Sequence, residues 1–587
     1  MAHKTNRKKV LLALPTIVVL LVMEGCREGA WEEHCGADDA PNATLLETLG
    51  NDGRFSRFAH LLHQSRCDSL LLGSQTFTIF APTDDAIDEM VIDSDLSTRF
   101  FKNHIARFVW GWQDLADTSY VRVKMLSGKY QELTRDADGI HWAGIALDGQ
   151  PIACSDGVIW PMGRKAEYYD NLWELLEHGV GTYDSLFHYI QSFDEISTLK
   201  SAIEMGENAK GQKLYYHNEW MKRYGSINLE DSLYTAILPT NVGWTAAINE
   251  IAPYFRTYGS LIQDKSVATN IIVKRTYEED TPLADSLQAA HTREALTRNL
   301  LFHRKVDFAN LPGDSISSTA GRVFHSPSYL IDGMKEQRVS NGICYPTDCM
   351  KHKPEESFLE TICVEAEQSS GRAMNFATVT TRSAAESNLR DVVSGMSYLE
   401  VINTSTSNLM QPQVQFDIPD VLAAPYDIYA VFVPALAFDT CAVGYRAPDT
   451  LLIQRDTLIA GTRYEAGDEA IIRFPYYDAD STKVCFYINY VHEGTDAAGL
   501  NMYEDKKIEA DPLTGEPFVT KGYEVTKFLV AKSFCFPYAN FSSSAFAKKS
   551  VQPVTTKIRV ATNLTTNDKK TLGYTMRLDC LMLVPAN

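Results

Sequence analysis

One stretch of sequence that joins an apolar strand to a helix occurs twice in this chain of 587 residues. The copies span residues 76–87 and 233–244, so the second begins 157 residues after the first. In both copies an apolar run ends in a proline and a threonine, which are Pro82-Thr83 and Pro239-Thr240. Proline pushes the residue before it into extended backbone, and threonine favours the position that caps a helix. The repeat therefore predicts two related domains, each with a strand that turns into a helix at this corner.

Two further landmarks follow each copy of the corner. A histidine, His104 or His303, stands where a helix is expected to end. Farther along, Asp156-Gly157 and Asn341-Gly342 each precede an apolar run. Such pairs readily take the positive φ of a tight turn before a strand. The same order of landmarks in both halves favours one fold present twice.

These three landmarks resemble the motifs of fasciclin domains. The resemblance implies two fasciclin-like domains, wedge-shaped β-sandwiches with helices, at residues 42–165 and 166–350. It assigns structural roles to the motif residues Pro82, Thr83, His104, Pro239, Thr240 and His303. In the second domain the histidine comes 63 positions after the threonine, against 21 positions in the first, so we expect insertions there. The resemblance implies binding and adhesion rather than catalysis.

The N-terminus has the pattern of an export signal. Basic residues precede the apolar run Val10–Met23, which is short for a membrane span, and Cys26 follows it. This arrangement resembles the lipoprotein box of bacteria, which implies a signal peptide at residues 1–25 and a lipid on Cys26 that holds the protein at a membrane. A plain secretory signal is the alternative. Residues 26–41 are expected to form an acidic tether, which resembles the surface-export signals of lipoproteins in the Bacteroides group.

Composition excludes one class of partner. The formal net charge is −20, so the chain offers no basic stripe for a phosphate backbone, and nucleic acid is not expected as a partner. Ten cysteines remain besides Cys26, and an even number in an exported protein permits disulfides. Several lie within apolar strand patterns, where a free thiol packs as a small core side chain. Cys344 and Cys349 are the nearest local pair if a bridge exists.

The pattern of apolar and polar residues changes near residue 350. Residues 351–361 are predicted to be a polar linker, and residues 362–587 consist of short alternating runs separated by turn residues. This pattern predicts an all-β sandwich, and its first and last strands resemble the jelly roll of galactose-binding-like modules. The expected fold class is therefore multidomain α+β, with two fasciclin-like domains followed by an all-β jelly-roll sandwich.

The sequence offers no constellation for catalysis. It has no Gly-x-Ser-x-Gly elbow, no phosphate-binding glycine loop and no His-Glu-x-x-His helix, so no catalytic residue, metal or cofactor is expected. His60, His63 and Cys67 have a spacing that could ligate zinc, but helix side chains are the favoured interpretation. Four tyrosines in loop-like sequence could stack on a sugar; they are Tyr476, Tyr477, Tyr503 and Tyr538.

The expected function follows from the resemblance and the export signal. Proteins of this layout in bacteria of the Bacteroides type look like accessory subunits of outer-membrane nutrient uptake. The chain is therefore expected to be a non-enzymatic, surface-exposed outer-membrane lipoprotein beside a TonB-dependent transporter and its lid lipoprotein. It would bind an oligosaccharide or peptide, or brace the complex. The alternative is a cell-surface adhesin that contacts other cells or host matrix.

Overall fold

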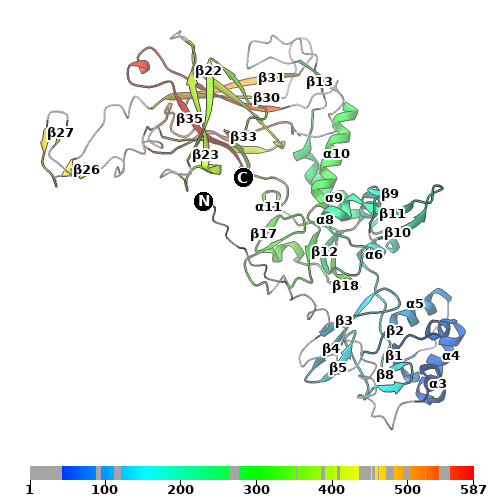
Figure 1. Cartoon of the computed structure of the whole chain (residues 1–587). Helices are drawn as coiled ribbons and strands as arrows, with labels where there is room; N and C mark the ends of the chain where they lie inside the picture. The colour runs from blue at the N-terminus through cyan, green and yellow to red at the C-terminus, as the bar shows by residue number, and fades with distance from the viewer. Residues whose placement is uncertain are drawn as a thin grey trace, which may run out of the picture. The chain divides into compact units, whose positions relative to one another are not determined.

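The computed structural model describes most of the chain from residue 42 onward (Figure 1). The described residues are 42–87, 94–110, 120–201, 203–258, 260–262, 276–279, 281–308, 310–351, 353–384, 390–405, 410–434, 451–452, 457–459, 462–467, 469–470, 481–492, 501–522, 524–540 and 555–586. The backbone divides into two compact units. Unit 1 comprises Met1–Gly179, Ser226–Thr235 and Glu336–Cys344, and unit 2 comprises Val180–Gly225, Ala236–Lys335 and Tyr345–Asn587. The expected signal peptide, Cys26 and the tether lie outside the described residues.

Unit 1 contains two four-stranded sheets beside a group of helices. The first sheet has the order β2-β1-β8-β7, built from β1 (Phe77–Pro82), β2 (Ile105–Arg107), β7 (Ile152–Cys154) and β8 (Gly157–Met162). The second has the order β3-β4-β5-β6, built from β3 (Tyr120–Lys124), β4 (Tyr130–Asp136), β5 (Gly139–Trp142) and β6 (Ile145–Ala146). The helices are α3 (Leu45–Asn51), α4 (Ser56–Gln64) and α5 (Ser94–His104). All six residues of β1 and of β8 are buried, as expected for parallel neighbours at the centre of a sheet.

The two copies of the repeat share their helix caps. Thr44 and Glu47 form a capping box at α3, and Asn171 and Glu174 form the same box at α6 (Leu172–His178). The turn side chains reach the same helix ends, because Asp156 Oδ1 accepts from the backbone N–H of Leu45 at 2.7 Å. Its counterpart Asn341 Oδ1 accepts from the N–H of Leu172 at 2.9 Å. The Asp-Gly and Asn-Gly pairs therefore tie a strand to a helix in both copies.

The glycines of these pairs are required by a close backbone approach. A Cβ on Gly157 would lie 2.0 Å from the carbonyl oxygen of Phe77, and one on Gly342 would lie 1.8 Å from that of Tyr234. Only Gly342 has a positive φ, of 146°. The expected positive φ at Gly157 is thus wrong, because close strand packing and not turn conformation requires glycine there.

The second copy forms a sheet with the order β15-β12-β19-β18, which parallels the order of the first. Its strands are β12 (Tyr234–Pro239), β15 (Leu301–His303), β18 (Gln337–Val339) and β19 (Gly342–Thr347). Its other helices are α7 (Asp184–Gln191), α8 (Glu219–Tyr224), α9 (Asn241–Ile251) and α10 (Thr281–Thr297). A three-stranded sheet follows α7, with the order β10-β11-β9, from β9 (Asp194–Ser197), β10 (Glu204–Glu207) and β11 (Lys213–Asn218).

The expected insertion in the second copy is present between α9 and α10. It contributes β13 (Ser260–Ile262) and β14 (Thr276–Glu279), and β14 pairs with β31 (Asn501–Ile508) of the C-terminal region. The extra residues therefore extend a sheet of the next domain.

The segment expected to be a polar linker, 351–361, packs against the second copy instead. It contains the short helix α11 (Pro354–Ser357), and Phe358 and Leu359 are buried. The ring of Phe358 contacts the rings of Tyr254 and Phe255 at centroid distances of 5.2 and 5.6 Å. The charged residues before Phe358 suggested a solvated linker, and the two apolar residues that follow them decide the packing.

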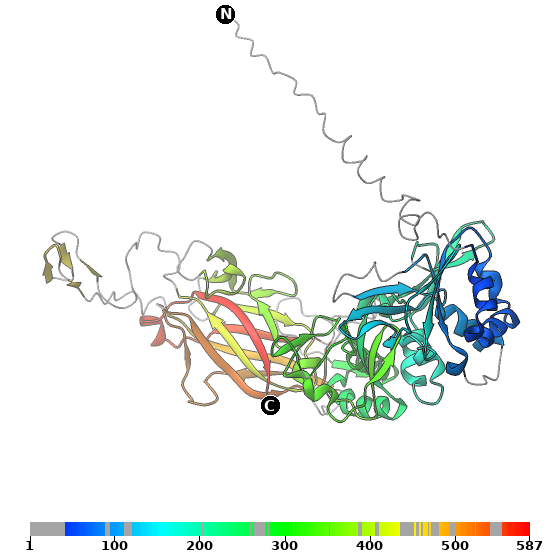
Figure 2. The ribbon, with the colours of Figure 1, turned by 90° about the horizontal axis from the view of Figure 1, so that it is seen from below.

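The C-terminal strands form a β-sandwich (Figure 2). One sheet has the order β22-β23-β35-β25-β33 with β20 also paired to β35; its strands are β20 (Ile362–Glu365), β22 (Ala377–Ser383), β23 (Ser397–Asn403), β25 (Pro425–Phe432), β33 (Thr526–Cys535) and β35 (Met576–Pro585). The other includes β21 (Ala373–Asn375), β24 (Gln413–Ile418), β30 (Lys483–Val491), β31, β32 (Phe518–Val519) and β34 (Thr556–Thr562). Aromatic side chains join the two layers, because Phe432 contacts Phe486 at 6.3 Å and Tyr490 contacts Phe534 at 5.1 Å. The expected multidomain α+β class is confirmed.

Unit 1 also contains a buried ion cluster. The Lys129 side chain is 4% exposed and lies between the carboxylates of Glu174 and Glu230, with 2.6 Å from Nζ to Glu230 Oε1. The same Glu230 oxygen accepts from Asn171 Nδ2 and Ser340 Oγ, both at 3.0 Å. Burial lowers the pKa of Lys129, but the hydrogen bonds to Glu174 and Glu230 outweigh it and hold the pKa above its usual value. Lys129 therefore stays charged and joins the first copy to segments of the second.

The eight described cysteines are all free thiols, including Cys344 and Cys349. Cys67, in the 3₁₀ helix η2 (Cys67–Leu71), belongs to the core of unit 1, where it packs as a small apolar side chain. Among the described residues, none of the helices has the length and apolar character needed to cross a bilayer.

Candidate functional site

The two Pro-Thr corners differ in the structure. Thr240 caps α9 as predicted, with its Oγ1 accepting from the N–H of Gly243 at 3.2 Å. Thr83 makes no such bond, and only the 3₁₀ turn η3 (Asp84–Ala86) follows it. Pro82 and Pro239 are both buried at the ends of their strands. The predicted corner is thus confirmed in both copies, but the helix directly after it only in the second.

Asp84 directly follows the first corner, but its side chain contacts a different helix. Its Oδ1 accepts from the N–H of Arg57 at 2.8 Å, and its Oδ2 accepts from the hydroxyl of Ser56. These residues begin α4, whose own N-cap position, Phe55, supplies no side-chain hydrogen bond. The carboxylate therefore stabilises the N-terminus of α4 and not of a helix that follows Thr83.

His104 has the structural role that the family motif implies. It is fully buried, its Nδ1 lies 2.8 Å from the carbonyl oxygen of Phe100, and its Nε2 accepts from the N–H of Ala166 at 3.1 Å. These partners require a neutral ring with the proton on Nδ1. Burial lowers the pKa of His104 to about 4, although the bond to Phe100 opposes this shift.

His303 does not occupy the equivalent position. Phe108 and Arg304, which have positive φ of 69° and 71°, directly follow the equivalent strands β2 and β15. His104 lies four residues before Phe108, and the residue four positions before Arg304 is the buried Leu300. His303 is instead an exposed residue of β15. The predicted equivalence of the two histidines is wrong, because an apolar side chain fills the core position in the second copy.

A polar cavity in unit 2 is the most developed candidate binding site. It has a volume of about 860 Å³, and α9, α10 and the 3₁₀ helix η5 (Ala252–Phe255) face β30, β31 and the end of β33 across it. Its polar lining residues are Asn249, Arg256, Gln288, Tyr490, His492 and Glu504. Two backbone hydrogen bonds join its two walls. The N–H of Ala423 donates to the carbonyl oxygen of Tyr254 at 2.8 Å, and the N–H of Ala539 donates to the carbonyl oxygen of Arg256 at 2.7 Å. Cavities of this size with a few polar groups are typical ligand sites.

The polar groups of the cavity are held in place. The Tyr490 hydroxyl donates to Glu504 Oε2 at 2.6 Å, and its ring packs on Phe534 and Phe536. Burial and the hydrogen bond to Glu504 raise the pKa of Tyr490 above its usual range. The phenol is therefore neutral, and the cavity presents a carboxylate beside a guanidinium, an imidazole and two amides. Hydrogen-bonding groups of both kinds suit a hydroxyl-rich or peptide ligand.

Of the four tyrosines predicted to stack on a sugar, only Tyr538 has a side chain that the structure describes. Tyr476 and Tyr477 lie outside the described residues, and Tyr503 lies on β31, where its side chain is not described. Tyr538 is near the cavity, but the guanidinium of Arg256 lies 4.7 Å from its ring and the ring of Tyr258 lies at 5.4 Å. Arg256 thus engages the face on which a sugar would stack. Stacking by these tyrosines stays a prediction.

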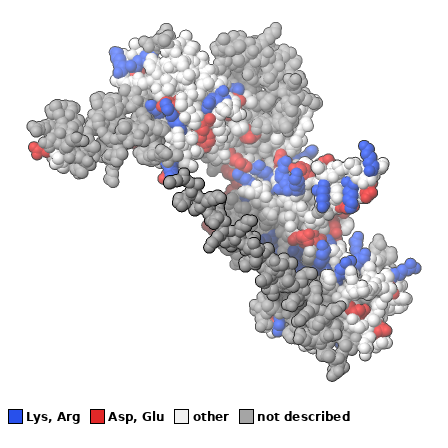
Figure 3. Space-filling view, viewed as in Figure 1, with Lys and Arg blue, Asp and Glu red and all other residues white. Residues whose placement is uncertain are grey.

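Sequence reasoning missed the cavity. Its residues come from six separate segments, and only the fold brings them together. The one signal was the insertion near residue 260, which extends the sheet that carries Tyr490 and Glu504. On the face drawn in Figure 3, the described acidic and basic side chains are interspersed.

Comparison with known proteins identifies one domain. Residues 53–164, in unit 1, match the family model of the fasciclin domain, a module typically used in non-enzymatic adhesion. No curated protein matches the chain.

Three solved structures are similar in part. A fasciclin domain pair from the insect cell adhesion molecule Fasciclin I is 10% identical, covers 52% of this chain and 99% of its own, and has a TM-score of 0.20. A xanthan lyase from Paenibacillus is 13% identical over 42% of this chain and 16% of its own, with a TM-score of 0.19. A family 35 carbohydrate-binding module from Clostridium thermocellum is 8% identical over 39% of this chain and 99% of its own, with a TM-score of 0.15. Scores this low support no assignment.

Proposed function

We propose that this chain is a non-enzymatic binding protein. The observation that carries the proposal is the fasciclin domain at residues 53–164, with its corner and its strand-to-helix ties repeated in the second copy. Such modules hold partners through fixed surfaces, and the ties of Asp156 and Asn341 to helix ends provide rigidity and not a reactive group. The proposed ligand site is the polar cavity of unit 2, and an oligosaccharide or peptide is the ligand class that its mixed donors and acceptors suit.

The cavity can be tested with Tyr490→Phe, which removes the hydroxyl and keeps the ring packing. We expect affinity for a bound oligosaccharide or peptide to fall about 5- to 10-fold, because the hydrogen bond that holds the Glu504 carboxylate in place within the cavity is lost. Isothermal titration calorimetry against a panel of both classes provides the measurement. Tyr487→Phe is the matched control, because alternation along β30 places it on the opposite face. Equal affinity in the two variants would show that the ligand binds elsewhere.

We further propose that the protein is an outer-membrane lipoprotein, exposed at the cell surface and anchored through Cys26. Support comes from the apolar run Val10–Met23 and the cysteine that follows it. In this setting the chain serves a TonB-dependent transporter and its lid lipoprotein as an accessory subunit for glycan or peptide uptake. The second candidate, a cell-surface adhesin, is favoured by the fasciclin match itself.

The anchor gives the next prediction. Cys26→Ser is expected to prevent acylation, so the protein should leave the membrane fraction and lose the mass of its acyl chains. Fractionation and mass spectrometry of the mature protein provide the readout, with Cys349→Ser as control. A variant that still sediments with the membrane would contradict the anchor. Pull-down of the acylated protein from solubilised outer membrane then separates the two roles, since a transporter barrel among the partners supports uptake and its absence supports adhesion.

A further inference from the structure

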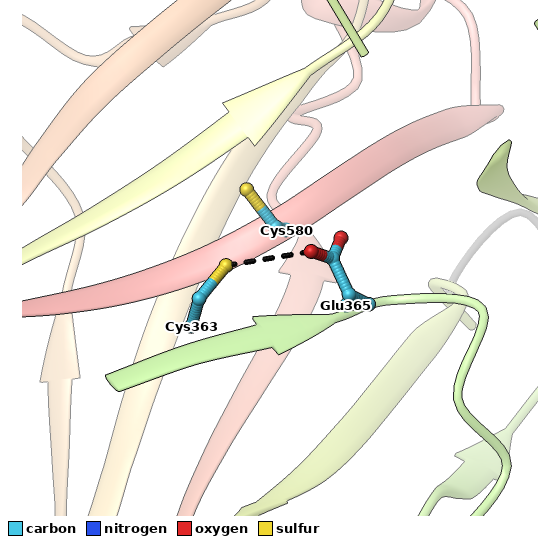
Figure 4. A group of neighbouring side chains, drawn as sticks. All are labelled: Cys363, Glu365 and Cys580. Atoms are coloured by element: carbon cyan, nitrogen blue, oxygen red, sulfur yellow. Dashed lines mark hydrogen bonds between the residues drawn. The ribbon is translucent and has the colours of Figure 1, made fainter. Parts of the chain in front are cut away.

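Two cysteines and a glutamate meet at the edge of the C-terminal sandwich (Figure 4). Cys363 and Glu365 lie on β20 and Cys580 lies on β35, which are antiparallel neighbours. Glu365 is opposite Cys580, and Cys363 is two residues away on the same face of β20. The ligand atoms of the three side chains all lie within 4.8 Å of one another. The fold thus brings together donors that are far apart in the sequence.

The register argues against a disulfide between the two cysteines. Cys363 pairs with Met582, so Cys363 and Cys580 are diagonal and not opposite. Diagonal residues of an antiparallel pair have Cα atoms roughly 7–8 Å apart, whereas disulfides rarely join Cα atoms more than about 7 Å apart. Both cysteines are free thiols in the structure. Two thiolates on one tetrahedral zinc ion need a sulfur separation of only about 3.8 Å, from bonds of about 2.3 Å.

One carboxylate oxygen of Glu365 is hydrogen-bonded and the other lacks a hydrogen-bond donor. Glu365 Oε1 accepts from the hydroxyl of Ser394 at 2.5 Å and lies 3.6 Å from the sulfur of Cys363. Glu365 Oε2 is buried and has no hydrogen-bond partner among the described residues. A buried carboxylate oxygen without a donor is costly, and a bound cation would satisfy it.

Access to this cluster is also present. Cys580 is buried at 3% exposure, while Cys363 is exposed and lines a second cavity of about 450 Å³ in unit 2. A metal held by the three side chains would therefore have one position open toward solvent.

We propose that Cys363, Glu365 and Cys580 form a binding site for a thiophilic divalent cation of the zinc class. Two sulfur donors select zinc over calcium or magnesium, which prefer oxygen ligands. Three protein ligands leave a fourth tetrahedral position for water or an external donor. The site lies outside the polar cavity of the proposed function and is independent of it.

Cobalt(II) is the probe for this site, because thiolate ligands give it a near-ultraviolet charge-transfer absorption. The reduced full-length protein should develop this band with one cobalt ion bound, and zinc should abolish it by displacement. Cys363→Ser should weaken cobalt binding more than roughly 100-fold, since loss even of an outer-shell partner costs about 10- to 100-fold. Glu365→Gln should weaken binding while the sulfur band persists at saturation.

Cys349→Ser is the matched control, because it removes another exposed thiol of unit 2. It should bind cobalt like the unmodified protein. Thermal unfolding without metal shows whether Cys363→Ser folds normally, and Cys580→Ala provides a second removal of sulfur. Absence of the band, or a band that survives both cysteine variants, would overturn the proposal. Intact mass and thiol alkylation that reveal a Cys363–Cys580 disulfide would overturn it as well.

Discussion

Replacing Lys129 by Met is expected to destabilise unit 1 by about 3–5 kcal/mol. The variant leaves the carboxylate of Glu230, whose side chain is 12% exposed, without its cation in a buried site. Breaking one side of a buried pair is costly because the remaining charge keeps its desolvation penalty. Urea unfolding followed by tryptophan fluorescence measures the effect, because Trp142 and Trp160 are buried in the same unit.

Two further variants sharpen this experiment. Adding Glu230→Gln to Lys129→Met removes the orphaned charge and should recover part of the lost stability. Arg54→Gln breaks the exposed pair with Asp52 and should change the unfolding midpoint little, because exposed pairs contribute little. Similar midpoints for Lys129→Met and Arg54→Gln would refute the assignment of the buried cluster as a stabilising tie.

The second large effect is a dependence of stability on pH that originates at His104. Its pKa is about 4 in the folded protein and about 6.5 in an unfolded chain, so the unfolded state binds the proton first as pH falls. Stability should be fully present above pH 6.5, fall by roughly 3 kcal/mol between pH 6.5 and pH 4, and lose nothing more from this group below pH 4.

His104→Gln removes this titration and isolates it from the carboxylates. The variant is expected to be less stable at neutral pH and to show a smaller loss between pH 6.5 and pH 4 than the unmodified protein. Urea unfolding at stepped pH gives both slopes. His60→Gln, an exposed change on α4, should retain the unmodified slope. Equal slopes in the His104 variant and the unmodified protein would refute the buried neutral imidazole.

The sequence could predict those parts of the fold that depend on local chemistry. The two corners and the alternating strands after residue 362 are encoded by neighbouring residues, whereas the ties of Asp156 and Asn341 to distant helix ends are not. The predicted correspondence of His303 with His104 was wrong because it relied on residue type alone. Alignment of the strands β2 and β15 pairs His104 with Leu300 instead. The prediction of a helix after Thr83 was wrong because Asp84 accepts a hydrogen bond from the start of α4 instead. This contact joins separate segments, so no local pattern reveals it.

The candidate sites were beyond prediction for the same reason. The polar cavity combines side chains of α9, α10, β30 and β31, and the thiol cluster joins β20 to β35. The cysteines appeared in apolar strand patterns, so a core thiol was the natural interpretation. Only the strand register shows that Cys363 and Cys580 share one face.

The central place of β35 has a consequence for how the molecule is made. This strand pairs with β25 on one side and with β20 and β23 on the other. These three strands are synthesised earlier and lack this pairing partner until β35 is made. During synthesis the residues of unit 1, the last of which is Cys344, emerge before those of the sandwich, and domains generally fold as units from the N-terminus. The sandwich stays open until residues 576–585 leave the ribosome. Until then the edges of its unpaired strands can pair with other chains.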